Sequence, residues 1–156
     1  MKNGETMLKL QGADELSLDA KGRIAIPARR REALRDASDG QLVLTAHPHR
    51  CLLLYPAPEW APIRDKVLAA SGLSMQTTVI KRLLVGNARD ETMDSAGRVL
   101  IAPELRQFAE LEKKVWLVGQ GGHFEIWSDT GWKQQQEVFY SLSEMPLPQG
   151  LEDLAL

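Results

Sequence analysis

The 156-residue sequence has little cysteine and no long hydrophobic segment, and each absence excludes a class of protein. The single cysteine, Cys51, cannot form an internal disulfide, which suits a reducing compartment. The longest apolar runs, such as 51–55 and 99–102, are far shorter than the roughly 20 residues of a membrane-spanning helix. The first residues, MKNGETMLKLQGADE, lack the apolar block of a secretion signal. We therefore expect a cytoplasmic protein with no membrane partner.

The sequence also lacks the GxSxG, HExxH and GxxxxGK[ST] motifs of common hydrolase, metalloprotease and nucleotide-binding sites. The best candidate for a metal site is the segment HPHRC, in which His47, His49 and Cys51 could share one strand face and bind zinc. Pro48 would interrupt such a strand, and the matching segment of the second half, GQGG, is a plain turn. We therefore predict no enzyme activity, no catalytic residues, no metal and no cofactor.

A strong overall charge is missing as well, because the net charge is -2 and the isoelectric point is about 5.9. Such a protein does not bind nucleic acid with its whole surface. The basic residues are nevertheless concentrated locally. Between Asp19 and Asp36 there are six lysines and arginines against three acidic residues, a local charge of +3.

The sequence contains one phrase twice. DAKGRIAIPARRRE (19–32) returns 75 positions later as DSAGRVLIAPELRQ (94–107), with the same spacing of Asp, Gly and Arg. VLTAHPHRCLLLYP (43–56) similarly matches VWLVGQGGHFEIWS (115–128) at an offset of 72. Each unit has about 45 residues, a size at which one core is marginal, so we expect the two copies to complete each other.

Each unit reads as strand, strand, helix, strand, strand. Leu16 and Leu18 before the first phrase's turn, and Ile24 and Ile26 after it, alternate with polar residues, which predicts a half-buried local hairpin. The proline that follows ends the strand and opens a short helix. A second hairpin should turn at 47–50 in the first copy and at 119–122 in the second. Two connecting helices should lie between the copies, and another should begin after Ser128 or Asp129.

Four residues of the doubled phrase have the chemistry of a tight turn. An Asp at the first turn position accepts a backbone N–H, and a Gly at the fourth position supplies a positive φ angle. We therefore assign structural turns to Asp19 and Gly22 in the first copy, and to Asp94 and Gly97 in the second.

The arginines favour a nucleic-acid surface. If Ile24 faces the core, Arg23 faces outward, and Lys21 lies at the tip of the turn. Arg98 takes the outward position in the second copy. A groove of DNA could admit such a tip, because Arg can contact guanine in a bidentate manner.

The start of the first helix carries Arg29, Arg30 and Arg31 at the positive end of its dipole, where cations are unfavourable unless an anion such as phosphate binds. The second helix has Glu104 there instead. We read the first copy as the contact surface and the second as mainly scaffold. The predicted DNA-binding residues are Lys21, Gly22, Arg23, Arg29, Arg31 and Arg98.

The segments LSLDAKGRIAIPARRRE, GNARDETMDSAGRVLIAPELR, CLLLYPAPEW and LVGQGGHFEIW resemble the MraZ family. This resemblance implies an α+β, mainly β fold, in which two SpoVT/AbrB-like repeats with connecting helices form a pseudo-symmetric double-split β-barrel. It implies a ring-shaped homo-oligomer and a cytoplasmic, nucleoid-associated repressor. Its partner would be double-stranded DNA with repeated operator elements, upstream of the division and cell-wall gene cluster that contains its own gene. By position, the family's DNA-contacting loop falls on Lys21, Gly22 and Arg23.

One basic tip binds DNA weakly, so we expect several subunits to act together on repeated sites. An alternative is an AbrB-like protein-binding module of antitoxin type, which would hold a partner through the scattered leucines of its C-terminal tail. The predicted domains are an N-terminal lead at 1–12, whose disorder is left open, repeat 1 at 13–60, connecting helices at 61–88, repeat 2 at 89–132, and a C-terminal helix and tail at 133–156.

Overall fold

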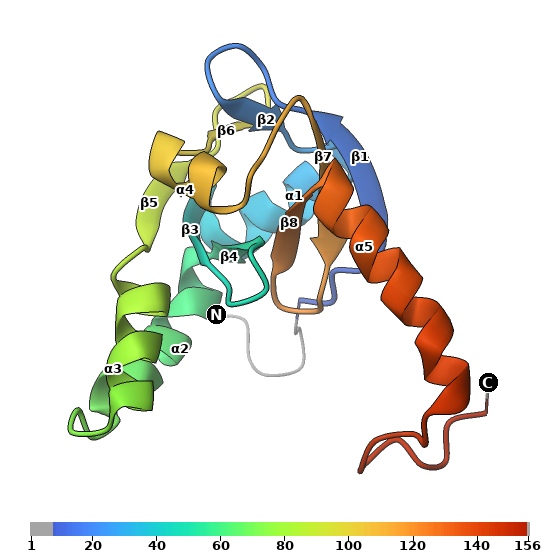
Figure 1. The fold of residues 1–156 in the computed structure, drawn as a ribbon. Coiled ribbons are helices and arrows are strands. Elements are labelled where there is room, and N and C mark those ends of the chain that lie inside the picture. Colours follow the sequence, from blue (N-terminus) through green and yellow to red (C-terminus); the bar gives the residue numbers. More distant parts are fainter. Residues whose placement is uncertain (1–7, 156) are drawn as a thin grey trace.

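The computed structural model describes residues 8–155, in which eight strands form two sheets. The larger sheet is antiparallel, with six strands in the order β1-β7-β8-β4-β3-β5. The smaller is a two-stranded ribbon of β2 and β6 (Figure 1). The bounds are β1 Ala13–Ser17, β2 Arg23–Ala25, β3 Gln41–Ala46, β4 Leu52–Pro56, β5 Arg89–Thr92, β6 Arg98–Leu100, β7 Lys114–Gly119 and β8 Phe124–Ser128.

The two repeats exchange strands. β1 of the first repeat pairs with β7 of the second, and β5 of the second pairs with β3 of the first, while β2 and β6 pair with each other. The predicted local hairpin at residues 16–26 is therefore wrong, although its turn forms. Alternation fixes which side chains face the core and leaves the partner strand open, and here each partner comes from the other repeat. The predicted second hairpins are confirmed, because β3 pairs with β4 and β7 with β8.

The sheet order is pseudo-symmetric, since β1, β7 and β8 occupy the positions that β5, β3 and β4 occupy on the other side. The α+β, mainly β class is confirmed. Closure into a barrel is wrong for the part of the chain that the structure describes, because β1 and β5 are the outer strands of the larger sheet and the β2–β6 ribbon stays separate.

The helices follow the predicted order. They are α1 Ala28–Ser38, α2 Ala57–Ala69, α3 Met75–Ile80, a π-helix η1 at Lys81–Val85, α4 Pro103–Phe108, α5 Asp129–Tyr140 and a 3-10 helix η2 at Ser141–Glu144. Pro103 is at the start of α4, where its missing N–H is not needed. The Ser128 hydroxyl caps α5 by accepting the Gly131 N–H at 2.9 Å.

The core lies between the β2–β6 ribbon, α1 and the larger sheet. The inward side chains of the ribbon, Ile24 and Val99, are almost completely buried, as are Ile26 and Ile101 beyond them. Burying each of these side chains stabilises the fold by about 1.5–3 kcal/mol. Both repeats supply residues to this one core, so the expectation that the copies complete each other is confirmed.

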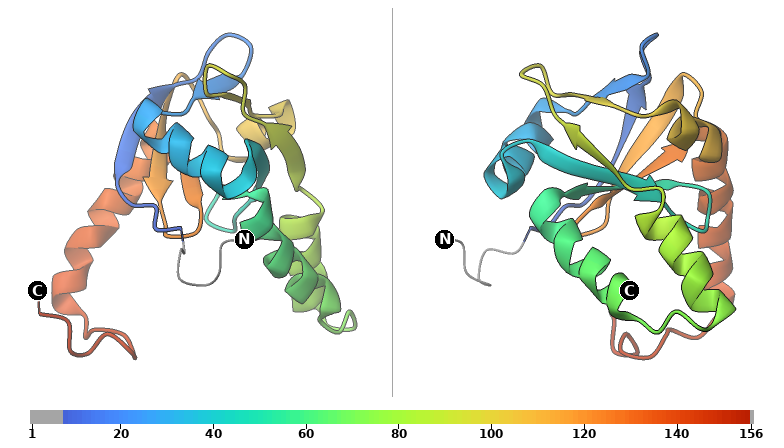
Figure 2. Two further views of the ribbon diagram at one scale, coloured as in Figure 1. Left: turned by 180° about the vertical axis from the view of Figure 1, so that it is seen from behind. Right: turned by 90° about the vertical axis from the view of Figure 1, so that its left-hand side faces the viewer.

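Two helical arms leave the sheet on opposite sides (Figure 1). Arm one (residues 57–85: α2, α3 and η1) is attached through Trp60, which packs on Tyr55. Arm two (residues 129–155: α5, η2 and the tail) is attached through Trp132, which packs beside Trp116 and Trp127. The two tryptophans occupy matching positions 72 residues apart. The turns before β2 and β6 lie at the opposite end of the molecule from the arms (Figures 1 and 2).

The N-terminal lead is partly described. Residues 1–7 lie outside the described residues, so the question of their disorder stays open. Leu10 is buried in the core and forms an antiparallel bridge with Gly121. No helix between residues 8 and 155 combines the length and the apolar character needed to cross a bilayer.

Candidate nucleic-acid interface

The first contact turn (residues 19–23) is organised by one carboxylate. Asp19 accepts the backbone N–H groups of Lys21 and Arg23 through Oδ1, each at 2.9 Å, and the Nε of Arg23 through Oδ2 at 2.9 Å. Gly22 has a φ of 83° and donates its N–H to the Asp19 carbonyl at 3.0 Å. The predicted turn roles of Asp19 and Gly22 therefore match the observed hydrogen bonds.

The second turn (residues 94–98) repeats this arrangement. Asp94 accepts the N–H groups of Ala96 and Arg98 at 2.9 and 2.8 Å, and the Arg98 Nε at 2.8 Å. Gly97 has a φ of 78°. The backbone N–H of Arg23 holds the pKa of Asp19 below its usual value, and the N–H of Arg98 does the same for Asp94.

The β2–β6 ribbon presents an outward face between the two turns. Arg23 lies opposite Leu100, and Ala25 lies opposite Arg98, so the two arginines occupy opposite corners of a short antiparallel ladder. Each arginine gives only its Nε to the aspartate of its own turn. Their Nη groups have no hydrogen-bond partner among residues 8–155, and Lys21 beside them is exposed.

The arginines at the start of α1 already form ion pairs within the chain, which the sequence did not indicate. Asp14 on β1 forms ion pairs with both Arg29 and Arg30, the latter at 3.2 Å. The Arg30 guanidinium also lies over the Phe124 ring, 5.6 Å from its centroid, so its head packs together with its stem. α1 has no acidic residue in its first turn, and Asp14 supplies the negative charge there.

The remaining basic residues of α1 hold the second turn. Arg31 donates through Nε to the Ile26 carbonyl at 2.7 Å, and its guanidinium occupies the space beside Gly97 that a Cβ would fill. Arg35, one helical turn later, donates to the carbonyls of Asp94 and Ser95 at 3.4 and 3.2 Å. The first repeat therefore supports the turn of the second.

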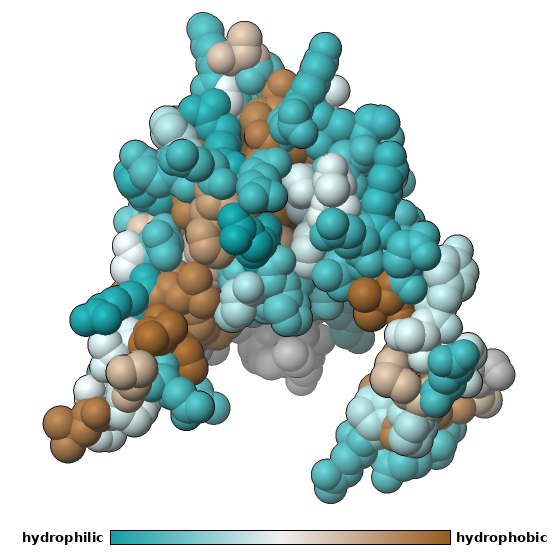
Figure 3. Space-filling model, in the orientation of Figure 1, coloured by the Kyte–Doolittle hydropathy of each residue, from teal (hydrophilic) through white to brown (hydrophobic). Residues whose placement is uncertain are grey.

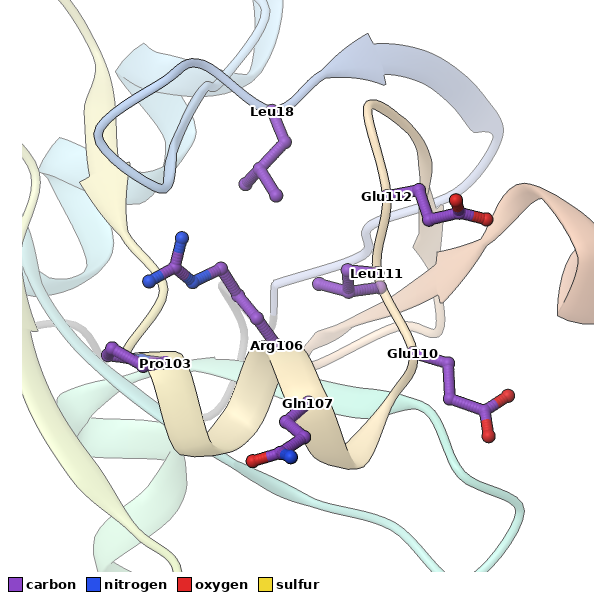
Figure 4. Close-up of a pocket in the computed structure, with 7 residues that line it drawn as sticks. All are labelled: Leu18, Pro103, Arg106, Gln107, Glu110, Leu111 and Glu112. Carbon is purple, nitrogen blue, oxygen red and sulfur yellow. The ribbon is translucent and has the colours of Figure 1, made fainter.

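Arg106 on α4 returns this support to the first turn. Its guanidinium lies against Gly22, where an added Cβ would be 2.5 Å from Nη1. Figure 4 shows the side chain rising from α4 toward the loop after Leu18, at the edge of a shallow groove of about 470 Å³. The buried Arg106 Nε has no hydrogen-bond partner among the described residues, which is consistent with a side chain held by packing on the turn.

The structure brings together four of the six predicted DNA-binding residues, namely Lys21, Gly22, Arg23 and Arg98, at the ribbon and its turns. It places Arg29 and Arg31 on α1, the first in an ion pair and the second in the support of the other turn. Sequence reasoning missed Arg35 and Arg106. The repeat itself offered a signal for Arg106, because it lies 75 positions after Arg31.

The candidate metal ligands do not form a site. The Nδ1 of His47 accepts the His49 N–H at 3.0 Å, and burial raises the pKa of the Cys51 thiol to about 12. A thiol that stays protonated at neutral pH is a poor zinc ligand. Among residues 8–155, no group of three histidine, cysteine or acidic side chains has a geometry that could hold a metal ion.

Comparison with known proteins places this geometry in a family. A family model described as "MraZ protein, putative antitoxin-like" matches the chain twice, over residues 10–83 and 84–154. The chain belongs to the MraZ family. The two matches agree with the doubled phrase and with the pseudo-symmetric sheet.

Curated MraZ relatives cover nearly the same length. "Transcriptional regulator MraZ" of Dechloromonas aromatica (strain RCB) is 63% identical over 146 residues, which is 94% of this chain and 99% of the relative. Its namesake in Azoarcus sp. (strain BH72) is 60% identical over 147 residues, with the same coverage. That of Nitrosospira multiformis is 47% identical over 146 residues, again 94% of this chain and 99% of the relative. These three curated relatives are named as transcriptional regulators.

Proposed function

We propose that this protein is a sequence-specific, DNA-binding transcriptional regulator that contacts DNA with the β2–β6 ribbon and the first turn. The observation that carries the proposal is the outward face of the ribbon. Arg23 and Arg98 project from it with their Nη groups unpaired within the described chain, and Lys21 extends from the adjoining turn.

The geometry suits the major groove. A two-stranded antiparallel ribbon fits the groove's width of about 12 Å, and an arginine can donate two hydrogen bonds to O6 and N7 of guanine. Asp19 binds the Arg23 Nε and so orients the guanidinium with its Nη edge outward before any DNA arrives. Lys21, a compact charge at the tip, suits a phosphate. We assign base recognition to Arg23 and phosphate contact to Lys21.

The α1 residues have secondary parts in this proposal. Arg29 is exposed and pairs with Asp14, so a phosphate would compete with that carboxylate for it. Arg31 acts by holding the Gly97 turn, which sets the position of Arg98. Gly22 acts through its positive φ, which allows the backbone to turn between Lys21 and Arg23.

The regulator would act as an oligomer on repeated sites. One subunit offers only a few DNA contacts, and the protein as a whole is acidic, so linked subunits gain affinity through effective concentration. The family resemblance supports a ring that represses the division and cell-wall gene cluster containing its own gene. A cytoplasmic, nucleoid-associated location belongs to the same proposal.

The test is fluorescence-anisotropy titration of the purified protein with a duplex from upstream of its gene, beside a scrambled duplex, across a range of salt concentrations. We expect tight binding to the first duplex alone. The slope of log K against log salt should be about -0.9 for each phosphate contacted, and Lys21→Ala should reduce its magnitude by about 1.

The matched control for the loss of a basic side chain is Arg50→Asn, in the turn between β3 and β4. Arg50 is exposed, pairs with Glu110 and has a φ of 65°, a conformation that asparagine tolerates. This variant should bind like the wild type. Weak, equal binding of the wild type to both duplexes would contradict the proposal and favour the antitoxin-type alternative. That alternative predicts that a small protein, bound through the C-terminal tail, co-purifies with this one.

A further inference from the structure

One large apolar side chain is exposed at the end of the molecule that carries the contact turns. Fourteen such side chains are exposed among the described residues, and thirteen of them lie on arm one or arm two. Figure 3 shows brown apolar patches around α2 and α3 at the lower left, and mainly hydrophilic side chains at the upper end, where the turns lie. The fourteenth side chain is Leu100 on β6, which is 41% exposed. Leu100 is therefore the large apolar side chain of the surface that we assign to DNA.

The fold fixes the direction of the Leu100 side chain. Val99 and Ile101, the residues on either side of it, are completely buried, so alternation turns Leu100 outward to the same face as Arg98. Leu100 lies directly opposite Arg23 in the antiparallel ladder. The Cβ atoms of such a pair are about 4.5–5.5 Å apart. The two side chains therefore lie side by side on the outward face of the ribbon.

The two halves of the ribbon differ at this position. Leu100 matches Ala25 at the offset of 75 residues, just as Arg98 matches Arg23. Ala25 and Leu100 are both exposed, so packing of the core does not account for the larger side chain. Ala25 lies opposite Arg98, at the other corner of the ladder. The outward face thus carries two matching arginines and one large apolar side chain, which lies on the side of the first turn.

The major groove of DNA offers one kind of apolar group. All four bases present hydrogen-bond donors or acceptors there, and thymine also presents its C5-methyl group. A leucine side chain makes no hydrogen bonds, so thymine is the base whose edge it can distinguish. Adjacent base pairs are about 3.4 Å apart along the helix axis. The spacing of the Arg23–Leu100 pair therefore corresponds to about one or two base pairs.

We infer that Leu100 is a specificity-determining residue, which packs against the C5-methyl group of a thymine within about two base pairs of the guanine that Arg23 contacts. The inference rests on the proposed function and adds a second recognised base to it. Ala25 is too short to make the matching contact beside Arg98. The ribbon therefore has a direction on the DNA, because only one of its two halves reads a thymine.

The test removes the methyl group from the DNA. Deoxyuridine pairs with adenine as thymidine does and lacks only the C5-methyl group. Each thymine of the operator duplex is replaced in turn, at the same place in every repeated element, and binding of the full-length protein is measured by fluorescence anisotropy. We expect one such replacement to weaken wild-type binding about fourfold for each element bound, the effect of removing one methyl group from an apolar contact. Leu100→Ala should bind the thymine and uracil duplexes equally at that position.

Two further variants separate this contact from a general effect of substitution. Leu100→Met keeps an apolar side chain of similar volume and should retain the preference for thymine. Leu73→Ala removes a leucine that is 98% exposed on arm one, and it should discriminate between the two duplexes as the wild type does. The readout is the ratio of two affinities of the same variant, so a change in the overall stability of that variant cancels from it.

The position of the thymine provides a second check. Replacing each guanine by an analogue that has carbon in place of N7 removes one acceptor of the arginine contact. The guanine whose replacement weakens the wild type but not Arg23→Ala is the one that Arg23 contacts. The thymine should lie within about two base pairs of it, and a thymine farther away would overturn the inference.

The outcomes distinguish this inference from the proposed function. Loss of the thymine preference in Leu100→Ala, with its retention in Leu100→Met, supports both. The same ratio of affinities in the wild type and Leu100→Ala at every thymine overturns the inference, and it leaves the proposed function standing where the wild type still prefers the operator to the scrambled duplex. Weak, equal binding of the wild type to the operator and scrambled duplexes overturns both.

Discussion

The two turns share one skeleton and differ in what surrounds them. In each, an aspartate accepts two backbone N–H groups and an arginine Nε, and a glycine has a positive φ. The first turn carries Lys21 at its tip where the second has Ala96, and the Arg106 guanidinium lies against its glycine. The second is braced by both Arg31 and Arg35. Both turns have the same internal hydrogen bonds, whereas the charge available for a partner is greater at the first.

The two copies also differ in which element carries the positive side chain of a strand–helix ion pair. Asp14 on β1 pairs with Arg29 on α1, and 75 positions later Arg89 on β5 pairs with Glu104 on α4. Strand and helix have exchanged their charges. The repeat thus preserves the attraction that joins its first strand to its helix and places the positive partner on the helix in the first copy only.

The largest effect should come from the glycines of the turns. Gly22→Val would combine an unfavourable φ with an overlap against the Arg106 guanidinium, and should cost about 2–3 kcal/mol of folding stability. Gly97→Val should cost a similar amount, because it meets Arg31. Urea denaturation measures both losses. At protein concentrations where both variants are folded, Gly22→Val should lose operator binding about tenfold more than Gly97→Val, and equal binding losses would erase the distinction between the turns.

Replacing the two ribbon arginines should affect DNA affinity to different extents in the two copies. Arg23→Ala should weaken specific binding by about 1–3 kcal/mol if the guanidinium makes a bidentate base contact. Arg98→Ala should cost less, because the turn that positions Arg98 has no lysine at its tip. Both are measured by anisotropy on the same duplex, with the scrambled duplex to remove phosphate effects. Equal losses would mean that the two copies read DNA in the same way.

The two strand–helix ion pairs should contribute differently to the free energy of unfolding. Asp14→Ala leaves Arg30 without its carboxylate, and the side chains of Asp14 and Arg30 are only 15% and 13% exposed, so the loss should be about 1–3 kcal/mol. Arg89→Ala breaks a pair whose side chains are 49% and 66% exposed, and should cost less than about 1 kcal/mol. Urea midpoints test the difference. A larger loss for Arg89→Ala would show that the exposed pair supports more of the fold than its solvent exposure suggests.

The smallest expected effect is on the pH dependence of stability in acid. The pKa values of Asp19 and Asp94 are lowered in the folded protein, so each carboxylate stabilises the turns fully above the ordinary aspartate value of 3.8. That contribution is lost as the pH falls from this value through the lowered pKa. Melting temperatures from pH 7 to pH 3 should decline less steeply at the acid end for Asp19→Asn than for the wild type, and Asp94→Asn should behave alike. If melting temperature falls with pH in both variants as it does in the wild type, the two aspartates do not contribute to the loss of stability in acid.

Local chemistry was readable from the sequence. The turns, the inward isoleucines, the helix after each proline and the cap at Ser128 all follow from interactions within a few residues. The strand partners were not readable, because β1 and β7 are about a hundred positions apart and alternation is the same for any partner.

The arginines of α1 show the same limit. A run of three at a helix start predicts a phosphate site when the neighbours are unknown. In the folded chain Asp14 on β1 pairs with Arg29 and Arg30, and the Ile26 carbonyl accepts from Arg31. The carbonyls of residues 94 and 95 accept from Arg35, so each arginine of α1 has a partner. The charge pattern located the basic residues, and only the tertiary contacts show which of them already have partners within the described chain.

Because the two repeats exchange strands, one chain corresponds to a dimer of repeats joined by a peptide linker. A lone repeat would leave its β1 and its β3 edges unpaired, so it could satisfy them only by associating with a second copy, at a concentration-dependent cost. Joining the copies in one polypeptide removes that dependence, since dilution cannot separate them. The two copies also occupy different stretches of the chain, so their sequences can differ. One half can then keep a bare alanine at its turn while the other keeps a lysine.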